Sequence, residues 1–280
     1  MKSAITTTDI NFLKDKARDL RIEILKMLTE AGSGHTGGSL SAADIVTALY
    51  FYKMRHNAED PKWRERDRFL LSKGHAAPLL YAVLALSGYF DKPLLKTLRK
   101  LGSPLQGHPC SKMLPGVEVS TGSLGQGLSI ANGIALGLKL DRLNSRVYCL
   151  LGDGEIQEGQ VWEAAMTASH YRLDNVCAII DNNGLQIDGQ CCDVMSIEPI
   201  VDKWKAFGWH VIDINGHDME AILEAFAEAE TVKLKPTMII ARTVKGKGIS
   251  FFEGKVQYHG IAPTREELEK ALKELGGNGQ

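Results

Sequence analysis

Two polar clusters follow two predicted apolar strands of the sequence directly. The Gly-Asp-Gly tripeptide at 152–154 ends one strand, and the Asp-Asn-Asn-Gly segment at 181–184 ends the next. Ligands of open α/β sheets bind at the carboxyl ends of strands, so we expect the side chains of Asp153 and Asn183 to lie close together. A carboxylate and a carboxamide are oxygen donors that Mg²⁺ takes when a diphosphate completes its coordination. Because the flanking glycines leave backbone N–H groups free for phosphate, the pattern predicts a metal–diphosphate site.

Four histidines stand beside glycines in predicted loops, where an imidazole is free to reach a pocket: His35, His75, His108 and His259. Imidazole gains and loses protons near neutral pH, so these side chains are candidate acids and bases. The remaining four histidines are expected to be structural: His56, His170, His210 and His217. His217 is placed in this group because the next residue, Asp218, can cap a helix.

The elements that must position these residues alternate regularly after residue 122. Strands are predicted at 147–151, 176–181, 209–214 and 237–243, and helices at about 127–143, 160–171, 199–207 and 219–231. Strands made of continuous Val, Ile, Leu and Cys runs are buried on both faces. We therefore expect a doubly wound α/β fold, in which a mainly parallel sheet carries helices on both faces.

Less regular elements precede this alternation. Apolar residues three and four positions apart predict a helix over about 9–29, and a second helix is expected from an N-cap at Ser39 to about Lys53. A short strand over 68–72 leads into a helix over 78–86. The stretch 102–122 has no clear periodicity and is long for a loop, so we expect it to be functional or disordered.

Composition excludes several classes of protein. The chain has 280 residues and a formal net charge of −1, so no global charge draws it to nucleic acid or to an anionic membrane. The first residues lack the apolar core of a signal peptide, and no apolar run is long enough to span a membrane. These features predict a cytoplasmic protein, and the length fits one large domain or two small ones.

The five cysteines are an odd set without Cys-x-x-Cys spacing, which argues against a disulfide framework and a structural zinc site. Cys149 and Cys177 lie in apolar runs and are predicted to be core residues. The neighbouring pair Cys191 and Cys192 is predicted to lie in a surface turn.

Five further glycine-containing segments indicate which protein family the sequence resembles. They occur in the order 33–39, 72–75, 106–109, 121–127 and 258–263 around the two strand-end clusters. Together these segments resemble transketolase, and in particular the separately encoded amino-terminal subunit of split bacterial and archaeal transketolases. The resemblance extends from about residue 10 to 275. It implies a single diphosphate-binding domain over 1–280 with a flexible glycine-rich tail at 276–280.

The resemblance implies two cofactors, thiamine diphosphate and Mg²⁺. Ca²⁺ or Mn²⁺ can substitute for the Mg²⁺. Asp153, Asn183 and the backbone carbonyl of Leu185 would hold the metal. Gly154 and Gly125 would give backbone contacts to the cofactor. The full set of residues implied to contact it is His75, Ser123, Leu124, Gly125, Gly152, Asp153, Gly154, Glu158, Asn183, Lys245 and His259.

The resemblance also gives roles to the four loop histidines. His35 and His259 would lie near the reacting oxygens of the sugar, His75 beside the cofactor and His108 on the donor hydroxyls. Glu158 would stand at a subunit junction, although an acid in the first turn of a helix also has a purely structural explanation, as does Glu155. Thr36 and Ser123 stand where full-length transketolases often carry proline.

The activity implied is transfer of a two-carbon ketol unit from a ketose phosphate to an aldose phosphate. The pyrimidine-binding domain would belong to a separate carboxyl-terminal subunit, in an α₂β₂ assembly. Four alternatives stay open: a split transketolase for a specialised ketose such as apulose phosphate or a sulfonated sugar, a deoxyxylulose-phosphate synthase-like enzyme, the α subunit of a 2-oxo acid dehydrogenase, and a non-catalytic binding subunit.

Overall fold

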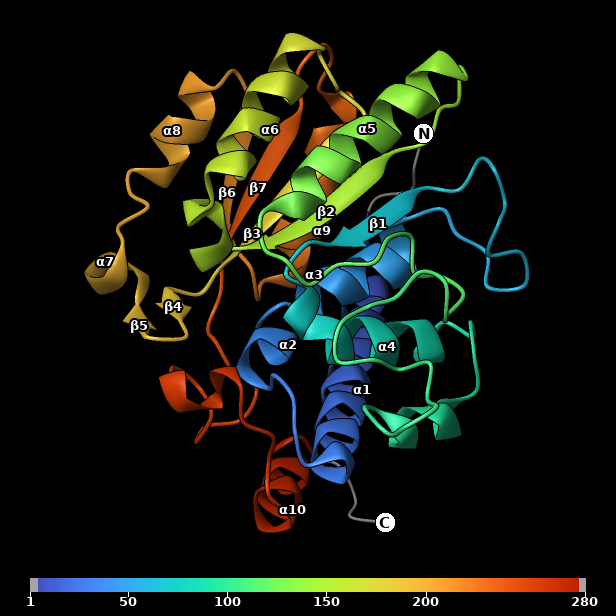
Figure 1. Ribbon diagram of the computed structural model, residues 1–280, viewed down its shortest axis with the longest axis vertical. Coiled ribbons are helices and arrows are strands. Elements are labelled where there is room, and N and C mark those ends of the chain that lie inside the picture. Colours follow the sequence, from blue (N-terminus) through green and yellow to red (C-terminus); the bar gives the residue numbers. More distant parts are fainter. Residues whose placement is uncertain (1–4, 277–280) are drawn as a thin grey trace.

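The computed structural model describes residues 5–276, and a five-stranded parallel sheet forms its centre (Figure 1). The strands run in the order β1-β2-β3-β7-β6, with every neighbouring pair parallel. Their bounds are β1 (Arg68–Leu71), β2 (Val147–Gly152), β3 (Val176–Asn182), β6 (His210–Asn215) and β7 (Thr237–Arg242). The order reverses between β3 and β7, which makes the carboxyl edge there a topological switch point.

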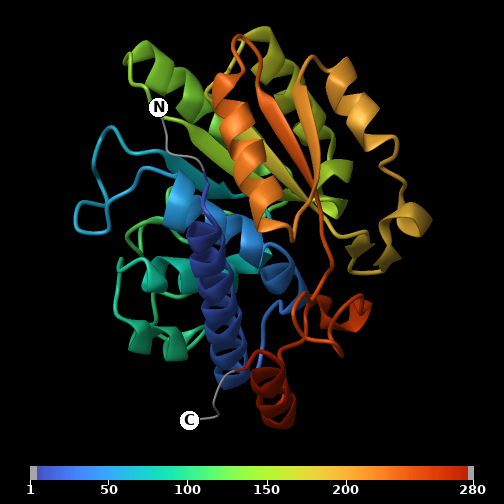
Figure 2. The ribbon, with the colours of Figure 1, turned by 180° about the vertical axis from the view of Figure 1, so that it is seen from behind.

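Helices cover both faces of this sheet, as predicted. Figure 1 shows α5 (Gln126–Leu140) and α6 (Gly159–His170) in front of the strands, where they share a core with α8 (Ile200–Ala206). Seen from behind, α1 (Thr7–Ala31) and α9 (Met219–Thr231) lie in front (Figure 2). They pack with α3 (Ala43–Ala48) and α4 (Ala77–Leu86). The doubly wound α/β prediction is therefore confirmed.

The central strands contribute side chains to a hydrophobic core on each face of the sheet, because successive side chains of a strand point to opposite faces. On β2, Tyr148 and Leu150 belong to the core on the α1 side, whereas Cys149 and Leu151 belong to the core on the α5 side. Cys177 on β3 is also fully buried, so the core assignment of Cys149 and Cys177 is confirmed.

The prediction of one long helix capped by Ser39 was wrong. The chain instead forms α2 (Gly37–Ser41), α3 and a π-helical turn (Leu49–Lys53). Helix α2 follows Thr36, and the Ser39 hydroxyl donates to the carbonyl of His35 at 2.7 Å. Gly37, the first residue of α2, lies against Lys245, where an added Cβ would approach the Lys245 Cγ to 2.7 Å.

The carboxyl-terminal helix α10 (Arg265–Glu274) was not predicted. Thr264 and Glu267 form a capping box, in which each side chain accepts from the other's backbone N–H. That Thr-x-x-Glu signal is visible in the sequence. The expected flexible tail at 276–280 lies outside the described residues, except for Gly276.

The stretch 102–122 is irregular, as expected, and it is packed. Leu105, Leu114 and Val117 are buried in the core on the α1 side. After β3 the chain forms a small hairpin, β4 (Leu185–Gln186) and β5 (Gly189–Gln190), followed by α7 (Cys191–Val194). A 3₁₀ helix (Lys92–Thr97) follows α4, and three more lie at Gly74–Ala76, Gly154–Gln157 and Val256–His259.

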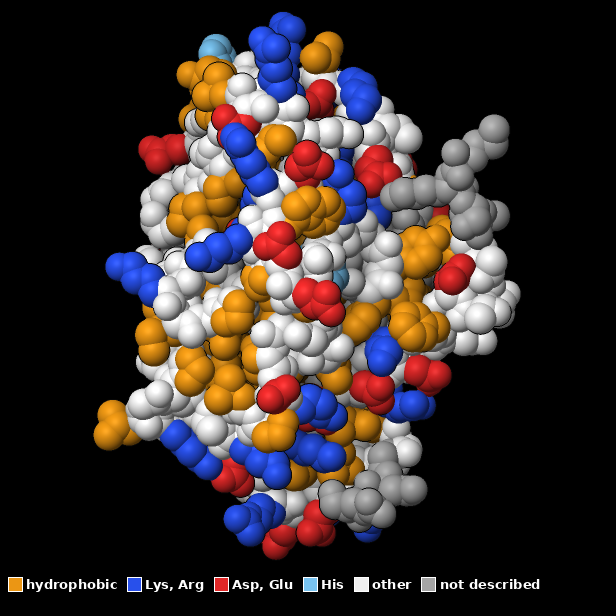
Figure 3. Space-filling view, turned by 90° about the vertical axis from the view of Figure 1, so that its right-hand side faces the viewer, with side chains coloured by type: hydrophobic (Ala, Val, Ile, Leu, Met, Phe, Trp, Pro, Cys, Tyr) orange, Lys and Arg blue, Asp and Glu red, His pale blue; other side chains and the backbone are white. Residues whose placement is uncertain are grey.

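All five cysteines are free. The predicted surface turn at 191–192 was wrong, because both cysteines begin helix α7; Cys191 is buried and Cys192 is exposed. Over residues 5–276 no helix has the length and apolar character needed to cross a membrane. The face in Figure 3 carries basic and acidic side chains interspersed, without a large field of one sign.

Candidate active site

A cavity of about 350 Å³ opens at the carboxyl ends of β1, β2 and β3. The cavity is lined by most of the residues that the sequence analysis identified as candidate site residues: His35, His75, His108, Leu124, Gly152, Asp153, Gly154, Glu158, Asn183, Leu185, Lys245 and His259. Ser123 is exposed and Gly125 is buried, and neither belongs to this lining. The fold thus brings together residues from eight separate segments of the chain.

The Asp153 carboxylate links the loops that follow β2 and β3. Its Oδ1 accepts a hydrogen bond of 2.8 Å from the Gly154 N–H, and its Oδ2 accepts one of 2.5 Å from the Gly184 N–H. Burial and, to a smaller extent, the negative charge of Asp181 together raise the pKa of Asp153 to about 6. A buried carboxylate of this kind is stabilised by a cation that binds beside it.

The two other predicted metal ligands belong to the same loop. Asn183 Oδ1 accepts from the Leu185 N–H at 3.1 Å, and its Nδ2 donates to Asp181 at 3.2 Å. The Leu185 carbonyl accepts from Lys245 Nζ at 2.8 Å. Within residues 5–276, no group of three or more His, Cys, Asp and Glu side chains is arranged to hold a metal. A metal here would therefore need oxygens from a ligand as well.

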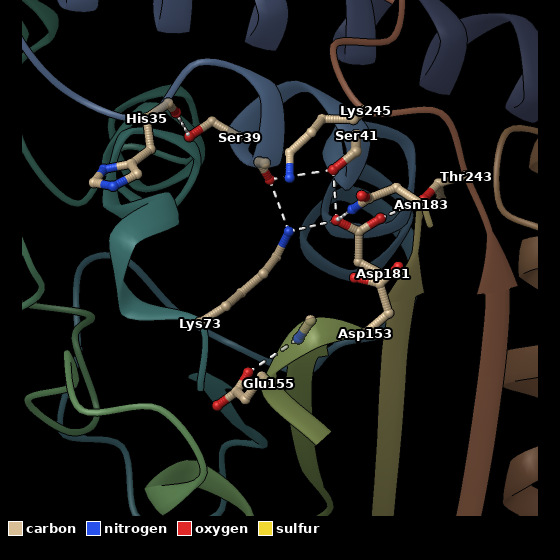
Figure 4. A network of polar contacts seen from close by, with 12 residues as sticks. His35, Ser39, Ser41, Lys73, Asp153, Glu155, Asp181, Asn183, Thr243 and Lys245 are labelled. Carbon is tan, nitrogen blue, oxygen red and sulfur yellow. Dashed lines mark hydrogen bonds and ion pairs between the residues drawn. The ribbon is translucent and has the colours of Figure 1, made fainter. Parts of the chain in front are cut away.

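Asp181 is the centre of a buried polar network (Figure 4). Its carboxylate accepts from Lys73 Nζ at 2.5 Å and from the hydroxyls of Ser41 and Thr243. Burial opposes ionisation, but Lys73 and these hydrogen bonds outweigh it and lower the pKa of Asp181. Lys73 also donates to the Gly38 carbonyl at 2.7 Å, so one network holds α2 against the ends of β1 and β3.

Glu155 has a structural task that the sequence left undecided. Its buried carboxylate accepts from the Ser72 hydroxyl, from the Gly125 N–H at 3.0 Å and from the Gly152 N–H at 3.0 Å. It therefore ties the ends of β1 and β2 to the loop before α5. Glu158, three residues later, is exposed and lines the cavity.

Three of the four loop histidines form a compact cluster. The ring centroids of His35 and His75 are 5.0 Å apart, those of His75 and His259 5.2 Å, and those of His35 and His259 5.6 Å. His108 stands apart from this cluster, exposed at the cavity, beside Gly122.

These imidazoles are neutral near pH 7. Burial and, to a smaller extent, neighbouring positive charges together lower the pKa of His35 to about 4, of His75 to about 2 and of His259 to about 3. A neutral imidazole has one N–H donor and one acceptor nitrogen. The Nδ1 atom of His35 is buried without a hydrogen-bond partner in the described part of the chain.

Lys245 sets the orientation of His259. Its Nζ lies 3.0 Å from His259 Nδ1 and 2.8 Å from the Leu185 carbonyl. Because an ammonium group only donates, Nδ1 accepts and the proton of neutral His259 resides on Nε2. Burial lowers the pKa of Lys245, whereas Asp153 and Asp181 oppose that effect.

The structural histidines are also accounted for. His56 contacts the Tyr89 hydroxyl at 3.1 Å and the Tyr50 carbonyl at 2.7 Å. His217 pairs with Asp44 at 2.8 Å and accepts from the Val244 N–H, while Asp218 caps α9 as predicted. None of the four predicted structural histidines is among the residues that line the cavity.

Comparison with known proteins shows to which family the chain belongs. Residues 13–280 match the family described as transketolase, thiamine diphosphate binding domain. The chain is 46% identical, over 95% of its length and 97% of the relative's, to 6-deoxy-6-sulfo-D-fructose transketolase subunit SqwG of Clostridium sp. (strain MSTE9). The chain belongs to the transketolase family.

Other members of the family differ in the share of their length that this chain covers. It is 44% identical to an apulose-4-phosphate transketolase subunit of Phocaeicola vulgatus, over 91% of this chain and 90% of the relative. Against human transketolase the identity is 46%, over 94% of this chain but 42% of the human protein. The crystal structure of Campylobacter jejuni transketolase superimposes with a TM-score of 0.91 at 38% identity, covering 96% of this chain and 43% of that one.

Proposed function

We propose that this chain is the cofactor-binding subunit of a two-chain transketolase that uses thiamine diphosphate and Mg²⁺. The reaction is transfer of a two-carbon ketol unit from a ketose phosphate to an aldose phosphate. One observation carries the proposal: the cavity joins Asp153 and Asn183, from the ends of neighbouring strands, to a cluster of three neutral histidines. The near-complete match to two proteins named as transketolase subunits supports it.

The residues present fit a metal bound together with a diphosphate. Asp153 Oδ, Asn183 Oδ1 and the Leu185 carbonyl are hard oxygen donors with one negative charge among them, which leaves coordination sites for phosphate oxygens. Glycines at 38, 122, 152 and 154 line the cavity, so a ligand can approach the backbone closely. At Gly122 and Gly154 an added Cβ would meet His108 at 3.4 Å and Gln186 at 3.1 Å. We assign Mg²⁺ to the metal; Ca²⁺ or Mn²⁺ would satisfy the same donors.

Thiamine diphosphate, when bound, supplies the carbon nucleophile and electron sink for breaking and forming a carbon–carbon bond. The protein's own contribution is proton movement and orientation. His35 and His259 are neutral, so each can donate to a sugar oxygen or accept a proton from a sugar hydroxyl. The His75 ring centroid lies 5.0 Å from that of His35 and 5.2 Å from that of His259, and exposed His108 is placed to bind donor hydroxyls.

A partner subunit would complete the site. Glu158 is exposed at the cavity, where a carboxylate of a second chain could meet it. The two relatives that this chain matches over at least 90% of their length are named as transketolase subunits, so we place the remaining domains in a separate carboxyl-terminal subunit, in an α₂β₂ assembly. With five free thiols and a net charge of −1, we place the protein in the cytoplasm, without nucleic acid or membrane among its partners.

A specialised ketose donor is the second candidate. The two subunit-type relatives are named for a sulfonated fructose and for apulose 4-phosphate. The residues that would bind the end of the sugar away from the reacting carbons are expected in the partner subunit. This chain is therefore compatible with either a common or a specialised ketose donor.

The test is reconstitution of the purified chain with its partner subunit. We expect ketol transfer by the mixture with Mg²⁺ and thiamine diphosphate, and none by either chain alone. Xylulose 5-phosphate, apulose 4-phosphate and 6-deoxy-6-sulfofructose as donors would separate the two candidates. Release of CO₂ from pyruvate by the mixture would instead indicate a 2-oxo acid dehydrogenase or deoxyxylulose-phosphate synthase type. Absence of Mg²⁺-dependent cofactor binding, measured by calorimetry, would indicate a non-catalytic subunit.

A further inference from the structure

His217 and Asp44 form the centre of a polar cluster outside the candidate active site. His217 Nδ1 lies 2.8 Å from Asp44 Oδ2, and the two side chains are only 12% and 11% exposed. Arg21 donates to the same carboxylate through Nη1 at 2.9 Å and Nη2 at 2.7 Å. Burial opposes ionisation of Asp44, but Arg21 and His217 outweigh it and lower the pKa of its carboxyl to about 2. The cluster therefore holds an ionised carboxylate at neutral pH and joins α1, α3 and the segment after β6.

The hydrogen bonds of His217 determine which ring nitrogen carries its proton. The Val244 N–H donates to His217 Nε2 at 2.8 Å, so Nε2 is unprotonated. The proton of the neutral ring therefore lies on Nδ1 and is donated to Asp44. His217 thus links the Asp44 carboxylate to the backbone of Val244 through two hydrogen bonds of fixed direction.

A close approach at Gly216 brings His217 to Val244. The Gly216 N–H donates to the Arg242 carbonyl, the last residue of β7, at 2.8 Å. A Cβ added at Gly216 would meet Thr243 Cγ2 at 2.5 Å. The residue before His217 must therefore be glycine for the β6–α9 connection to lie against the segment that leads into Val244.

Arg21 contacts the same segment on the other side of Lys245. Its Nε donates to the Lys247 carbonyl at 3.0 Å. Gly248 lies against the Arg21 side chain, where an added Cβ would meet Nε at 3.2 Å. The cluster centred on Asp44 thus contacts the backbone shortly before and shortly after Lys245.

Lys245 is buried, and its contacts depend on where the backbone places it. Its Nζ lies 2.8 Å from the Leu185 carbonyl and 3.0 Å from His259 Nδ1, and such hydrogen bonds weaken steeply when they are misaligned. We propose that His217 is a positioning residue of the candidate active site. By holding the Val244 N–H it keeps Lys245 Nζ on His259 Nδ1, and the proton of His259 therefore stays on Nε2. Its effect on catalysis rests on the proposed function, in which His259 exchanges a proton with the sugar.

Two substitutions that each keep one hydrogen bond of His217 test this role. An Asn side chain reaches the position of Nδ1 and can donate to Asp44, whereas a Gln side chain reaches that of Nε2 and can accept from Val244. His217→Asn therefore releases the Val244 N–H, and His217→Gln does not. A role confined to stability would give the two variants the same effect on His259.

Nuclear magnetic resonance of the purified full chain, labelled with ¹⁵N-histidine, reports the tautomers without cofactor or partner subunit. In the wild type we expect the proton of His217 on Nδ1 and that of His259 on Nε2. In His217→Asn the two ring-nitrogen shifts of His259 should move towards each other, because its tautomers then exchange. In His217→Gln they should stay as in the wild type.

His56→Asn is the matched control. His56 is also half-buried and makes two hydrogen bonds, but it contacts Tyr50 and Tyr89, away from the cavity. This variant should leave the His259 shifts unchanged. Unchanged His259 shifts in His217→Asn, or equal shifts in both His217 variants, would overturn the proposal. Even if His217→Asn fails to fold, a wild-type His217 protonated on Nε2 would overturn it.

The kinetic measurement uses the complex reconstituted with the partner subunit. The kcat of ketol transfer should fall about tenfold in His217→Asn, with little change in the KM for the ketose donor, and should stay near the wild-type value in His217→Gln. Equal kcat values in the two variants would contradict a positioning role. Absence of ketol transfer by the wild-type complex would instead reject the proposed function, while the His259 shifts would still decide the role of His217.

Discussion

Lys73 and Asp181 form a buried ion pair, with 2.5 Å between Nζ and Oδ2, that joins the end of β1 to the end of β3. The side chains are 2% and 0% exposed. Lys73 precedes His75 by two residues, and Asp181 precedes Asn183 by two. The pair therefore fixes the relative position of two candidate site residues that are far apart in the sequence.

Replacing Asp181 by Asn should destabilise the protein strongly, because the Lys73 ammonium would stay buried without its counter-charge. The expected loss in the free energy of unfolding is about 3–5 kcal/mol, measured by urea denaturation. Asp213→Asn is the matched control: Asp213 pairs with Arg242, but both side chains are about two-fifths exposed, so a loss below about 1 kcal/mol is expected. Similar losses in the two variants would contradict a special role for the buried pair.

Glu155→Gln tests the second network. The buried carboxylate accepts from Ser72, Gly125 and Gly152, and an amide has one acceptor oxygen in place of two. At least one buried donor would lose its partner, which should cost about 1–3 kcal/mol in the free energy of unfolding. Glu158→Gln, at an exposed position, should change it by less than about 0.5 kcal/mol. If both variants have wild-type stability, the Glu155 contacts do not organise these loops.

Asp153→Ala tests the metal site. It removes the only carboxylate among the three proposed metal ligands, so Mg²⁺-dependent binding of thiamine diphosphate should weaken at least about 100-fold in calorimetry of the reconstituted complex. Far-ultraviolet circular dichroism should show that the fold is retained. Asp193→Ala removes an exposed carboxylate of α7 and should bind the cofactor as the wild type does. Unchanged affinity in Asp153→Ala would place the metal elsewhere.

The sequence predicted the sheet and the cavity for a physical reason. Apolar runs at β2 and β3 require burial on both faces, and parallel strands bring their carboxyl ends to one edge, so Asp153 and Asn183 had to meet. The glycine-flanked histidines were found because loops beside glycine can approach a ligand. His35, His75 and His259 converge on the cavity, as that pattern indicated.

The buried polar networks could not be predicted from the sequence because their signals are not local. Asp181 and Lys73 are separated by more than one hundred residues, and neither has a periodic or motif context that predicts an ion pair. Glu155 could equally have been an acid that favours a helix N-terminus. The start of α2 at Gly37 accompanies a close approach of Gly37 to Lys245, a tertiary contact that no local pattern shows. By contrast, α10 could have been predicted from its Thr264-x-x-Glu267 capping box.

His35 should make the stability of the protein depend on pH. Its pKa falls from an ordinary value of 6.5 to about 4 in the folded state, chiefly through burial. Between these values the unfolded chain binds a proton that the folded chain does not, so stability is lost as pH falls from about 6.5 towards 4. The free energy of unfolding in urea at pH 7.0, 5.5 and 4.5 should therefore decline less steeply in His35→Gln than in the wild type. Identical slopes would show that His35 titrates normally in the folded protein.

Asp153 should make cofactor binding depend on pH in a range where a simple surface carboxylate would already be ionised. Its pKa in the folded chain is raised from 3.8 to about 6, first by burial and then by Asp181, and only the ionised form can ligate a metal. A raised carboxyl pKa means that the folded chain without metal gains stability from protonation, which is lost as pH rises through about 6.

The apparent affinity of the reconstituted complex for Mg²⁺ and thiamine diphosphate should then fall about tenfold for each pH unit below about 6, because one proton competes with the metal. Calorimetry between pH 5 and 8 would measure it, with Asp153→Asn as the reference, since its amide oxygen remains a ligand but does not titrate. Protonation of the diphosphate itself affects both proteins equally, so the difference between the two curves isolates Asp153. Parallel curves would show that Asp153 is already ionised at pH 5 and that its burial does not govern cofactor binding.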